Sequence, residues 1–205
     1  MEHRSELQEL SRVCHWMNSQ GLSPATSGNY SIREGKKSLL VSASGIDKGE
    51  IHEENFIKMN FDGSFEDRGF KPSDESLLHA KLYELSPGIH CVLHSHSIPI
   101  TVLSLATDED ELLLEGLEMQ KALTGTETHE LPIRIKIIDN HQNMNVLRGR
   151  LETVWNFSKG LDYAFILRGH GLYAWGKSIR EAKKHVEGLE FLFSCQLELK
   201  RMGLR

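Results

Sequence analysis

Two histidines separated by a single residue close an apolar run in this sequence. The run covers residues 89–96 and is typical of a buried strand, with His94 and His96 at its end. Because alternate side chains of a strand point to the same face, both imidazoles can reach one ion at the distance of about 2.0–2.1 Å that zinc requires. The alternative is a pair of surface histidines on an edge strand. Imidazoles beside a buried run need polar partners or a metal, which favours the metal site.

A third candidate ligand follows a second apolar run, YAFIL. The segment after it reads Arg168-Gly169-His170-Gly171, and the glycines on both sides of His170 allow backbone or ligand to approach closely. Taken alone, His170 also fits an ordinary turn histidine. Beside the other two histidines it is the best third ligand. Three protein ligands with one open position are the arrangement of a catalytic zinc site.

Two glutamates could serve as acids or bases. Glu75 stands where a helix begins, a place where a carboxylate is also favourable simply because of the positive end of the helix dipole. Glu118 lies in the segment LEGLEMQKAL and is otherwise explained as a solvated helix residue. Neither glutamate is distinguished from the many others by its local sequence alone.

Three turns rich in small residues could hold a phosphate group. They cover residues 26–29, 42–45 and 71–73. Glycines expose backbone N–H groups, hydroxyls donate hydrogen bonds, and a helix N-terminus at Ser73 favours an anion. Taken singly, each segment is also explained by ordinary turn chemistry.

The elements that must position these residues alternate along the chain. Leu7, Leu10, Val13 and Met17 predict a helix that ends near Gly21. Further helices are expected from about residue 72 to 87, at 99–106, 117–123, 144–154 and 178–202, and strands at 89–96, 133–137, 163–168 and 172–175. Residues 30–33 and 38–43 predict a hairpin, and 51–60 a strand or short helix. This mixture predicts an α/β layered domain with helices on a mostly antiparallel or mixed sheet.

Composition limits the class of protein. The chain has 205 residues, of which 39 % are hydrophobic and 26 % charged, with a net charge of −5, so we expect one globular domain over residues 1–205 and no nucleic-acid partner. No signal peptide and no apolar run long enough to cross a membrane are found. The three widely spaced cysteines fit reduced thiols in the cytoplasm.

Several segments together resemble the class II aldolase/adducin family. They are ATSGNYSI, VSASG, KPSDESLLHAKLY, HSHS and RGHGLYAWG, and the resemblance extends over about residues 25–199. It implies an α/β fold, the class II aldolase-like three-layer α/β/α arrangement with a central, mainly antiparallel sheet. It also implies a homotetramer with sites near subunit interfaces, and one Zn²⁺ per subunit held by His94, His96 and His170.

The resemblance also implies a small sugar-phosphate substrate. The family's phosphate site corresponds here to Gly28, Asn29, Ser44, Gly45 and Ser73. In the family's aldolases, the glutamate at the place of Glu75 is a further metal ligand and base. The family often has a small or hydroxyl residue where this chain has Asp74. Because a carboxylate would repel a phosphate, we expect Asp74 to point away from it.

Within the family, GLEMQKALTGTETHELPI and EFLFSCQLELK are most similar to dehydratases that remove water from a ketose phosphate in methionine salvage. In these enzymes the residue matched by Glu118 is the acid/base glutamate. The resemblance therefore implies zinc-dependent dehydration through an enediolate. Two alternatives stay open: a class II aldolase or 4-epimerase acting on another sugar phosphate, which Glu75 favours, and a non-catalytic adducin-like scaffold, which would not need the zinc ligands.

Overall fold

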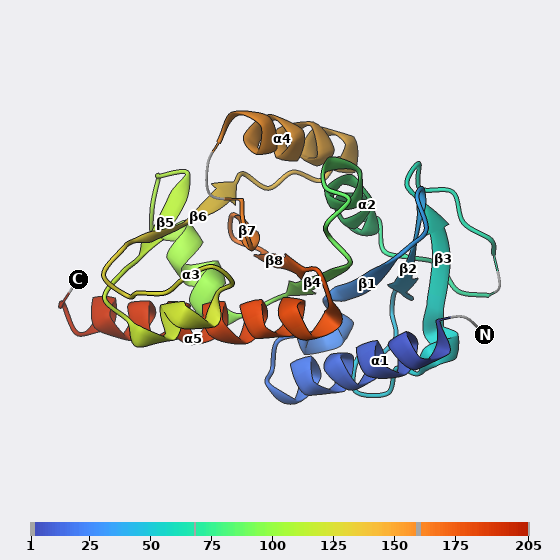
Figure 1. The fold of residues 1–205 in the computed structure, drawn as a ribbon, viewed down its shortest axis with the longest axis horizontal. Coiled ribbons are helices and arrows are strands. Elements are labelled where there is room, and N and C mark those ends of the chain that lie inside the picture. Colours follow the sequence, from blue (N-terminus) through green and yellow to red (C-terminus); the bar gives the residue numbers. More distant parts are fainter. Residues whose placement is uncertain (1–2, 68, 159–160, 205) are drawn as a thin grey trace.

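Eight strands form one sheet in the computed structural model, which describes residues 3–67, 69–158 and 161–204 (Figure 1). Their order across the sheet is β3-β2-β1-β4-β8-β7-β6-β5. Neighbouring strands are antiparallel, except that β6 and β7 run parallel. The strands are β1 (Asn29–Glu34), β2 (Ser38–Ser42), β3 (Phe56–Asn60), β4 (Cys91–Ser95), β5 (Glu111–Leu114), β6 (Ile133–Ile138), β7 (Ala164–Leu167) and β8 (Gly171–Gly176).

Helices cover both faces of the sheet. One apolar cluster joins the sheet to α1 (Arg4–Ser19), α3 (Ile98–Leu105) and α5 (Ile179–Arg201), and a second joins it to α2 (Ser76–Leu85) and α4 (Met144–Phe157). Figure 1 shows α2 and α4 above the sheet and α1 and α5 below it. Strand alternation explains the two clusters, since Leu93 of β4 belongs to the first and its neighbour Val92 to the second. The expected three-layer α/β/α fold is confirmed.

Most of the expected elements form, with a few differences in short segments. Residues 51–60 contain both alternatives, a 3₁₀ helix η2 (Glu53–Asn55) followed by β3, and the short helix after residue 117 is the 3₁₀ helix η3 (Glu118–Ala122). A third 3₁₀ helix, η1 (Pro24–Thr26), precedes β1. Strand β5 was not expected, because its sequence ELLL has no apolar–polar alternation. Strand β4 ends at Ser95, so His96 lies just beyond it.

The middle of the sheet places polar residues in one row. Strand β4 lies between β1 and β8, and its His94 is opposite Asn29 of β1 and Tyr173 of β8. Residues opposite each other on neighbouring strands share a face. The row therefore faces the layer that contains α2.

None of the helices in the described part of the chain combines the length and the apolar character that crossing a bilayer requires.

Gly171 allows β8 to lie close to β4 at this row. A Cβ atom added to Gly171 would collide with the Ser95 carbonyl oxygen and lie 3.0 Å from His94 Cε1. We predict that Gly171→Ala lowers the free energy of unfolding by about 1–3 kcal/mol, because the two strands must separate. Urea denaturation measures this change.

Gly149→Ala in α4 is the matched control. An added Cβ at Gly149 meets no atom within 4 Å, so this variant should be neutral or gain about 0.5–1 kcal/mol from the better helix propensity of alanine. Equal stability of the two variants would contradict the close approach of β4 and β8.

Candidate metal centre

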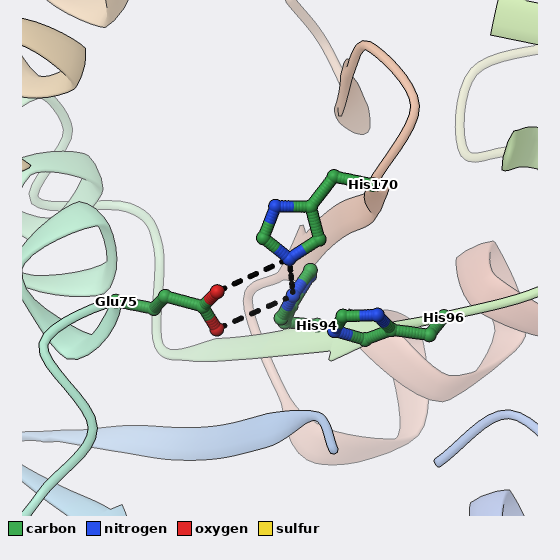
Figure 2. Close-up of side chains that lie close together, drawn as sticks. All are labelled: Glu75, His94, His96 and His170. Atoms are coloured by element: carbon green, nitrogen blue, oxygen red, sulfur yellow. Dashed lines mark hydrogen bonds and ion pairs between the residues drawn. The ribbon is translucent and has the colours of Figure 1, made fainter. Parts of the chain in front are cut away.

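Four side chains from three separate segments meet at the end of β4. They are Glu75, directly before α2, His94 in β4, His96 after β4, and His170 in the turn between β7 and β8. Their potential ligand atoms all lie within 4.8 Å of one another. Figure 2 shows the three imidazoles and the carboxylate converging on one point. The fold thus brings the three histidines of the sequence analysis together, and Glu75 joins them.

His94 is positioned by contacts with strand β8. Its side chain is fully buried, and its ring lies parallel to that of Tyr173, with 3.9 Å between the ring centroids. Its Nδ1 lies 2.9 Å from the carbonyl oxygen of Leu172. A carbonyl only accepts, so Nδ1 carries the proton and Nε2 presents its lone pair to the cluster. The hydrogen bond to Leu172 thus fixes the tautomer of His94 that a metal ligand needs.

His96 and its neighbour are anchored outside the strand. The backbone N–H of His96 donates to the Leu22 carbonyl, and its ring centroid lies 4.6 Å from that of His94 and 4.7 Å from that of His170. Between the two histidines, the Ser95 hydroxyl donates to the buried carboxyl of Glu190 in α5 at 2.8 Å. The segment that carries both imidazoles is therefore attached to the α5 layer as well as to the sheet.

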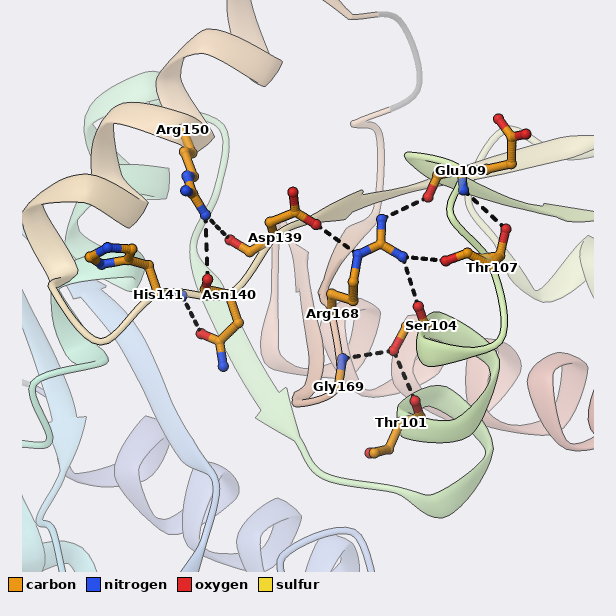
Figure 3. A network of polar contacts seen from close by, with 10 residues as sticks. All are labelled: Thr101, Ser104, Thr107, Glu109, Asp139, Asn140, His141, Arg150, Arg168 and Gly169. Carbon is orange, nitrogen blue, oxygen red and sulfur yellow. Dashed lines mark hydrogen bonds and ion pairs between the residues drawn. The ribbon is translucent and has the colours of Figure 1, made fainter.

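Hydrogen bonds from Arg168 stabilise the turn that carries His170. The guanidinium donates to the Asp139 carboxylate at 2.7 Å and to three carbonyl oxygens at the end of α3 and in the loop after it (Figure 3). Those carbonyls belong to Ser104, Thr107 and Glu109. Gly169, with a φ of +65°, lets the chain reverse directly before His170. No role of Arg168 is predicted from the sequence, because no local pattern shows which carbonyls its guanidinium contacts.

Glu75 contacts both the histidines of the cluster and strand β1. One carboxylate oxygen accepts from Asn29 Nδ2 at 2.8 Å, and the other lies 3.1 Å from His170 Nε2. Burial raises the pKa of Glu75, but the contacts with His170 and His94 and the Asn29 hydrogen bond outweigh it and bring the pKa to about 2. The carboxylate is therefore ionised at neutral pH.

Burial keeps the imidazoles of His94 and His96 neutral. It lowers the pKa of His94 well below the ordinary value, and it lowers the pKa of His96 to about 4, with the neighbouring His170 adding to both shifts. Metals bind neutral imidazole and ionised carboxylate, which is the state that His94, His96 and Glu75 already hold.

The spacing of the donor atoms also fits one ion. Two nitrogens bound tetrahedrally at about 2.0–2.1 Å from zinc lie about 3.3 Å apart. His94 Nε2 and His170 Nε2 are separated by 3.3 Å. Three nitrogens and one carboxylate oxygen suit a divalent first-row metal. The cluster can therefore hold such an ion with little rearrangement.

A cavity of about 270 Å³ adjoins His96 and Glu75. All five residues expected at a phosphate site line it, namely Gly28, Asn29, Ser44, Gly45 and Ser73. Lys48, for which the sequence predicts no role, also lines the cavity. The exposed Asp74 is not among the lining residues in the described part of the chain, which agrees with the expectation that it points away.

Glu118 lies apart from this cluster. It begins η3, its side chain is 69 % exposed, and its carboxylate pairs with Lys121 at 2.7 Å and His129 at 2.8 Å. Within the one chain described, Glu118 therefore does not join the four side chains of the metal centre. Its role as an acid/base stays a prediction.

Comparisons with known proteins give consistent results. The family model for the class II aldolase and adducin N-terminal domain matches residues 8–197. A methylthioribulose-1-phosphate dehydratase of Serratia proteamaculans is 42 % identical over 198 residues, which is 97 % of both chains. The dehydratase of the same name from Yersinia enterocolitica is also 42 % identical, over 97 % of this chain and 94 % of its own.

Solved structures share the fold. An L-fuculose-1-phosphate aldolase of Thermus thermophilus has a TM-score of 0.73 at 24 % identity, over 97 % of each chain. A sugar-phosphate aldolase of Thermotoga maritima has a TM-score of 0.70 at 22 % identity, over 99 % of this chain and 98 % of its own. At this identity the likeness concerns the architecture of the chain.

The metal centre can be tested by its metal content. We predict about one divalent ion per chain in the purified protein, and a decrease of at least about tenfold in His94→Ala and His170→Ala, because each removes a fixed nitrogen ligand. Atomic emission spectroscopy after gel filtration measures the content. His141→Ala, which changes an exposed histidine outside the cluster, should keep its metal. Full metal content in both cluster variants would rule out this site.

The buried histidines also predict a pH dependence of the metal-free protein. The pKa of His96 is about 4 in the folded chain, below the ordinary value of 6.5, so between these values only the unfolded chain is protonated at this residue. The free energy of unfolding should therefore decrease as the pH falls from about 6.5 to about 4, by up to about 1.4 kcal/mol per pH unit for each such histidine.

Urea titrations of chelator-treated protein at several pH values measure that slope. His96→Gln should reduce it by the share of one histidine, whereas His141→Gln should leave it unchanged. A stability independent of pH over this range would mean that the cluster histidines are not buried in their neutral form.

Proposed function

We propose that this chain, which belongs to the class II aldolase and adducin family, is a methylthioribulose-1-phosphate dehydratase. The reaction converts 5-methylthioribulose 1-phosphate to 2,3-diketo-5-methylthiopentyl 1-phosphate and water, a step of methionine salvage. The observation that carries this proposal is the 42 % identity, over 97 % of both chains, to a dehydratase of that name. The four clustered side chains support it with the ligands that such chemistry uses.

We propose Zn²⁺ as the ion, one per chain, with His94, His96 and His170 as its ligands. When bound, it would supply Lewis-acid polarisation of the C2 carbonyl of the ketose, which lowers the cost of removing the proton at C3. Glu75 lies within the same cluster. Its ionised carboxylate can complete the ligand set or accept a proton. The hydrogen bond from Asn29 fixes the orientation of this carboxylate in either role.

The substrate's phosphate is proposed to bind in the cavity beside His96. The support is that the five expected phosphate residues line this one cavity, together with Glu75 at its metal end. A phosphate held there would keep the ketose carbon chain beside the metal centre. Binding energy from this unreactive end can then contribute to orienting C3 and C4 for reaction.

Dehydration removes the C3 proton and the C4 hydroxyl, and the resulting enol becomes the diketone. We propose that Glu118 transfers these protons, accepting one from C3 and donating one to the departing hydroxyl. Its side chain is 69 % exposed and lies outside the cluster of its own chain, which supports a role at a contact between copies. We therefore propose a homotetramer in which Glu118 serves the metal centre of a neighbouring copy.

Two further proposals concern the setting of the enzyme. We propose that residues 1–205 form a single domain, and the one eight-stranded sheet with helices on both faces supports this. We also propose a cytoplasmic location. Cys14, Cys91 and Cys195 are free thiols, and the first two are buried, in keeping with a reducing compartment.

A class II aldolase or epimerase remains the second candidate. The observation that favours it is the position of Glu75 among the three histidines, where the family's aldolases have their glutamate ligand and base. An adducin-like scaffold is a weaker candidate, because such a protein has no need for four convergent metal-ligand side chains.

The assay for the proposed function is water elimination from methylthioribulose 1-phosphate. We expect the diketone to form with the metal-loaded protein, to be lost with a chelator, and to return on addition of zinc. Absorbance of the enolised diketone and mass spectrometry of the product measure this. Aldehyde release by carbon–carbon cleavage, without diketone, would instead support the aldolase. A metal-free protein that stays inactive after zinc addition would support the scaffold.

Glu118→Gln tests the proposed acid/base. We predict normal zinc content and folding, with kcat lower by about 10²–10⁴-fold, because the amide cannot exchange protons. Glu130→Gln, an exposed neighbour in the same segment, is the matched control and should keep full activity. Tetramers that mix Glu118→Gln and His94→Ala chains should recover activity, since one chain supplies the glutamate and another the metal centre. Inactive mixed tetramers would contradict catalysis across the subunit contact.

A further inference from the structure

One lysine is buried beside the proposed substrate cavity. Lys48 is only 1 % exposed, yet it lines the cavity next to Ser27, Gly28 and Gly45. Its ammonium group donates to the Thr26 carbonyl at 3.0 Å and to the Ile46 carbonyl at 2.9 Å. Among the described residues, no carboxylate lies within ion-pair distance of it. The cation is thus held by backbone dipoles alone.

A buried cation without a counter-charge is costly. Burial lowers the pKa of Lys48, and the nearby Asp47 and Cys14 oppose the shift without forming an ion pair with it. An ammonium has three N–H groups, of which the two carbonyls accept two. The third is available to an acceptor in the cavity. An anion placed there would compensate the charge that the protein leaves unpaired.

The turns at residues 26–29 and 42–45, on either side of the Lys48 ammonium's hydrogen bonds, have an unusual backbone. Ala25 and Thr26 have φ values of 51° and 65°, in the left-handed region that non-glycine residues rarely adopt, and Gly28 and Gly45 both have 78°. Backbone of this kind persists where surrounding contacts enforce it, often at ligand sites. Lys48 is such a contact, because its ammonium bonds to Thr26 in the first turn and to Ile46, directly after the second.

The lining between these turns includes an unsatisfied donor. The Ser27 hydroxyl is buried and has no hydrogen-bond partner in the described structure. A hydroxyl without a hydrogen-bond partner, in the same cavity as a lysine without an ion-pair partner, suits a negatively charged ligand with several acceptor atoms.

We propose that Lys48 is the residue that makes this cavity select a doubly charged phosphate ester, and that it holds the two turns at the spacing this group needs. The identity of the ligand as the phosphate of the substrate rests on the proposed function. Glu75, the acidic residue of the cavity, makes its contacts toward Asn29 and His170 at the metal end. Lys48 is therefore the cavity's cationic residue, and the Glu75 carboxylate is bonded to Asn29 and His170 rather than to it.

The first test is the binding of inorganic phosphate, which does not depend on turnover. We expect Lys48→Met to weaken phosphate binding in calorimetry by at least about tenfold, the usual effect of losing a charged hydrogen bond. KM for the phosphorylated substrate should rise by a similar factor, with a smaller change in kcat and unchanged zinc content. Lys36→Met changes an exposed lysine between β1 and β2 and should alter neither value.

A second variant separates charge from shape. Lys48→Ala with added propylammonium should recover phosphate binding, whereas propanol, which fills the same space without charge, should not. In the unaltered chain, phosphate should slow acetylation of Lys48 by acetic anhydride at least about tenfold and leave Lys36 unaffected, as read by peptide mass spectrometry. This last experiment does not depend on the folding of any variant.

Unchanged phosphate affinity in Lys48→Met, equal rescue by propanol, or acetylation of Lys48 that phosphate does not slow would each overturn the proposal. A wild-type chain that binds phosphate through Lys48 but forms no diketone would leave this inference standing and contradict the proposed dehydratase. The two failures are therefore distinguishable.

Discussion

A fully buried imidazole in the middle of a sheet must have both of its nitrogens satisfied, and His94 shows how the molecule meets this requirement. Nδ1 donates to the Leu172 carbonyl of the neighbouring strand, which leaves the lone pair of Nε2 facing the cluster. The ring lies on Tyr173, and β1 on the other side supplies Asn29, which orients Glu75. Three adjacent strands thus position His94 and Glu75, and burial keeps His94 neutral.

Sequence alone was sufficient for the parts of the site that depend on local pattern. The spacing of His94 and His96 at the end of an apolar run, and the glycines beside His170, predicted ligands that the fold brings within 4.8 Å of one another. Helix α5 was equally clear, because its apolar residues recur at helical spacing over a long segment. The grouping of Glu75 with these histidines, and of the three small-residue turns around one cavity, came from the resemblance to a family rather than from any single segment.

The remaining features depend on contacts that no local pattern encodes. Lys48 bonds to the Thr26 carbonyl and Arg168 to the Ser104 carbonyl, both distant in the sequence, and a carbonyl is present at every residue. Strand β5 has only four residues without alternation, so its pairing with β6 decides its structure. Glu118 differs again, since its proposed role depends on a second copy of the chain. These examples separate what periodicity can predict from what tertiary contact determines.

We propose that three histidines hold one divalent ion at the end of β4. X-ray absorption spectroscopy of the purified, metal-loaded protein tests it most directly, because it reports the ligands around the ion itself. We expect a zinc edge with three imidazole nitrogens at about 2.0–2.1 Å and the remaining position filled by oxygen. A shell of sulfur ligands at about 2.3 Å, or a shell of oxygens without imidazole, would rule out this histidine site.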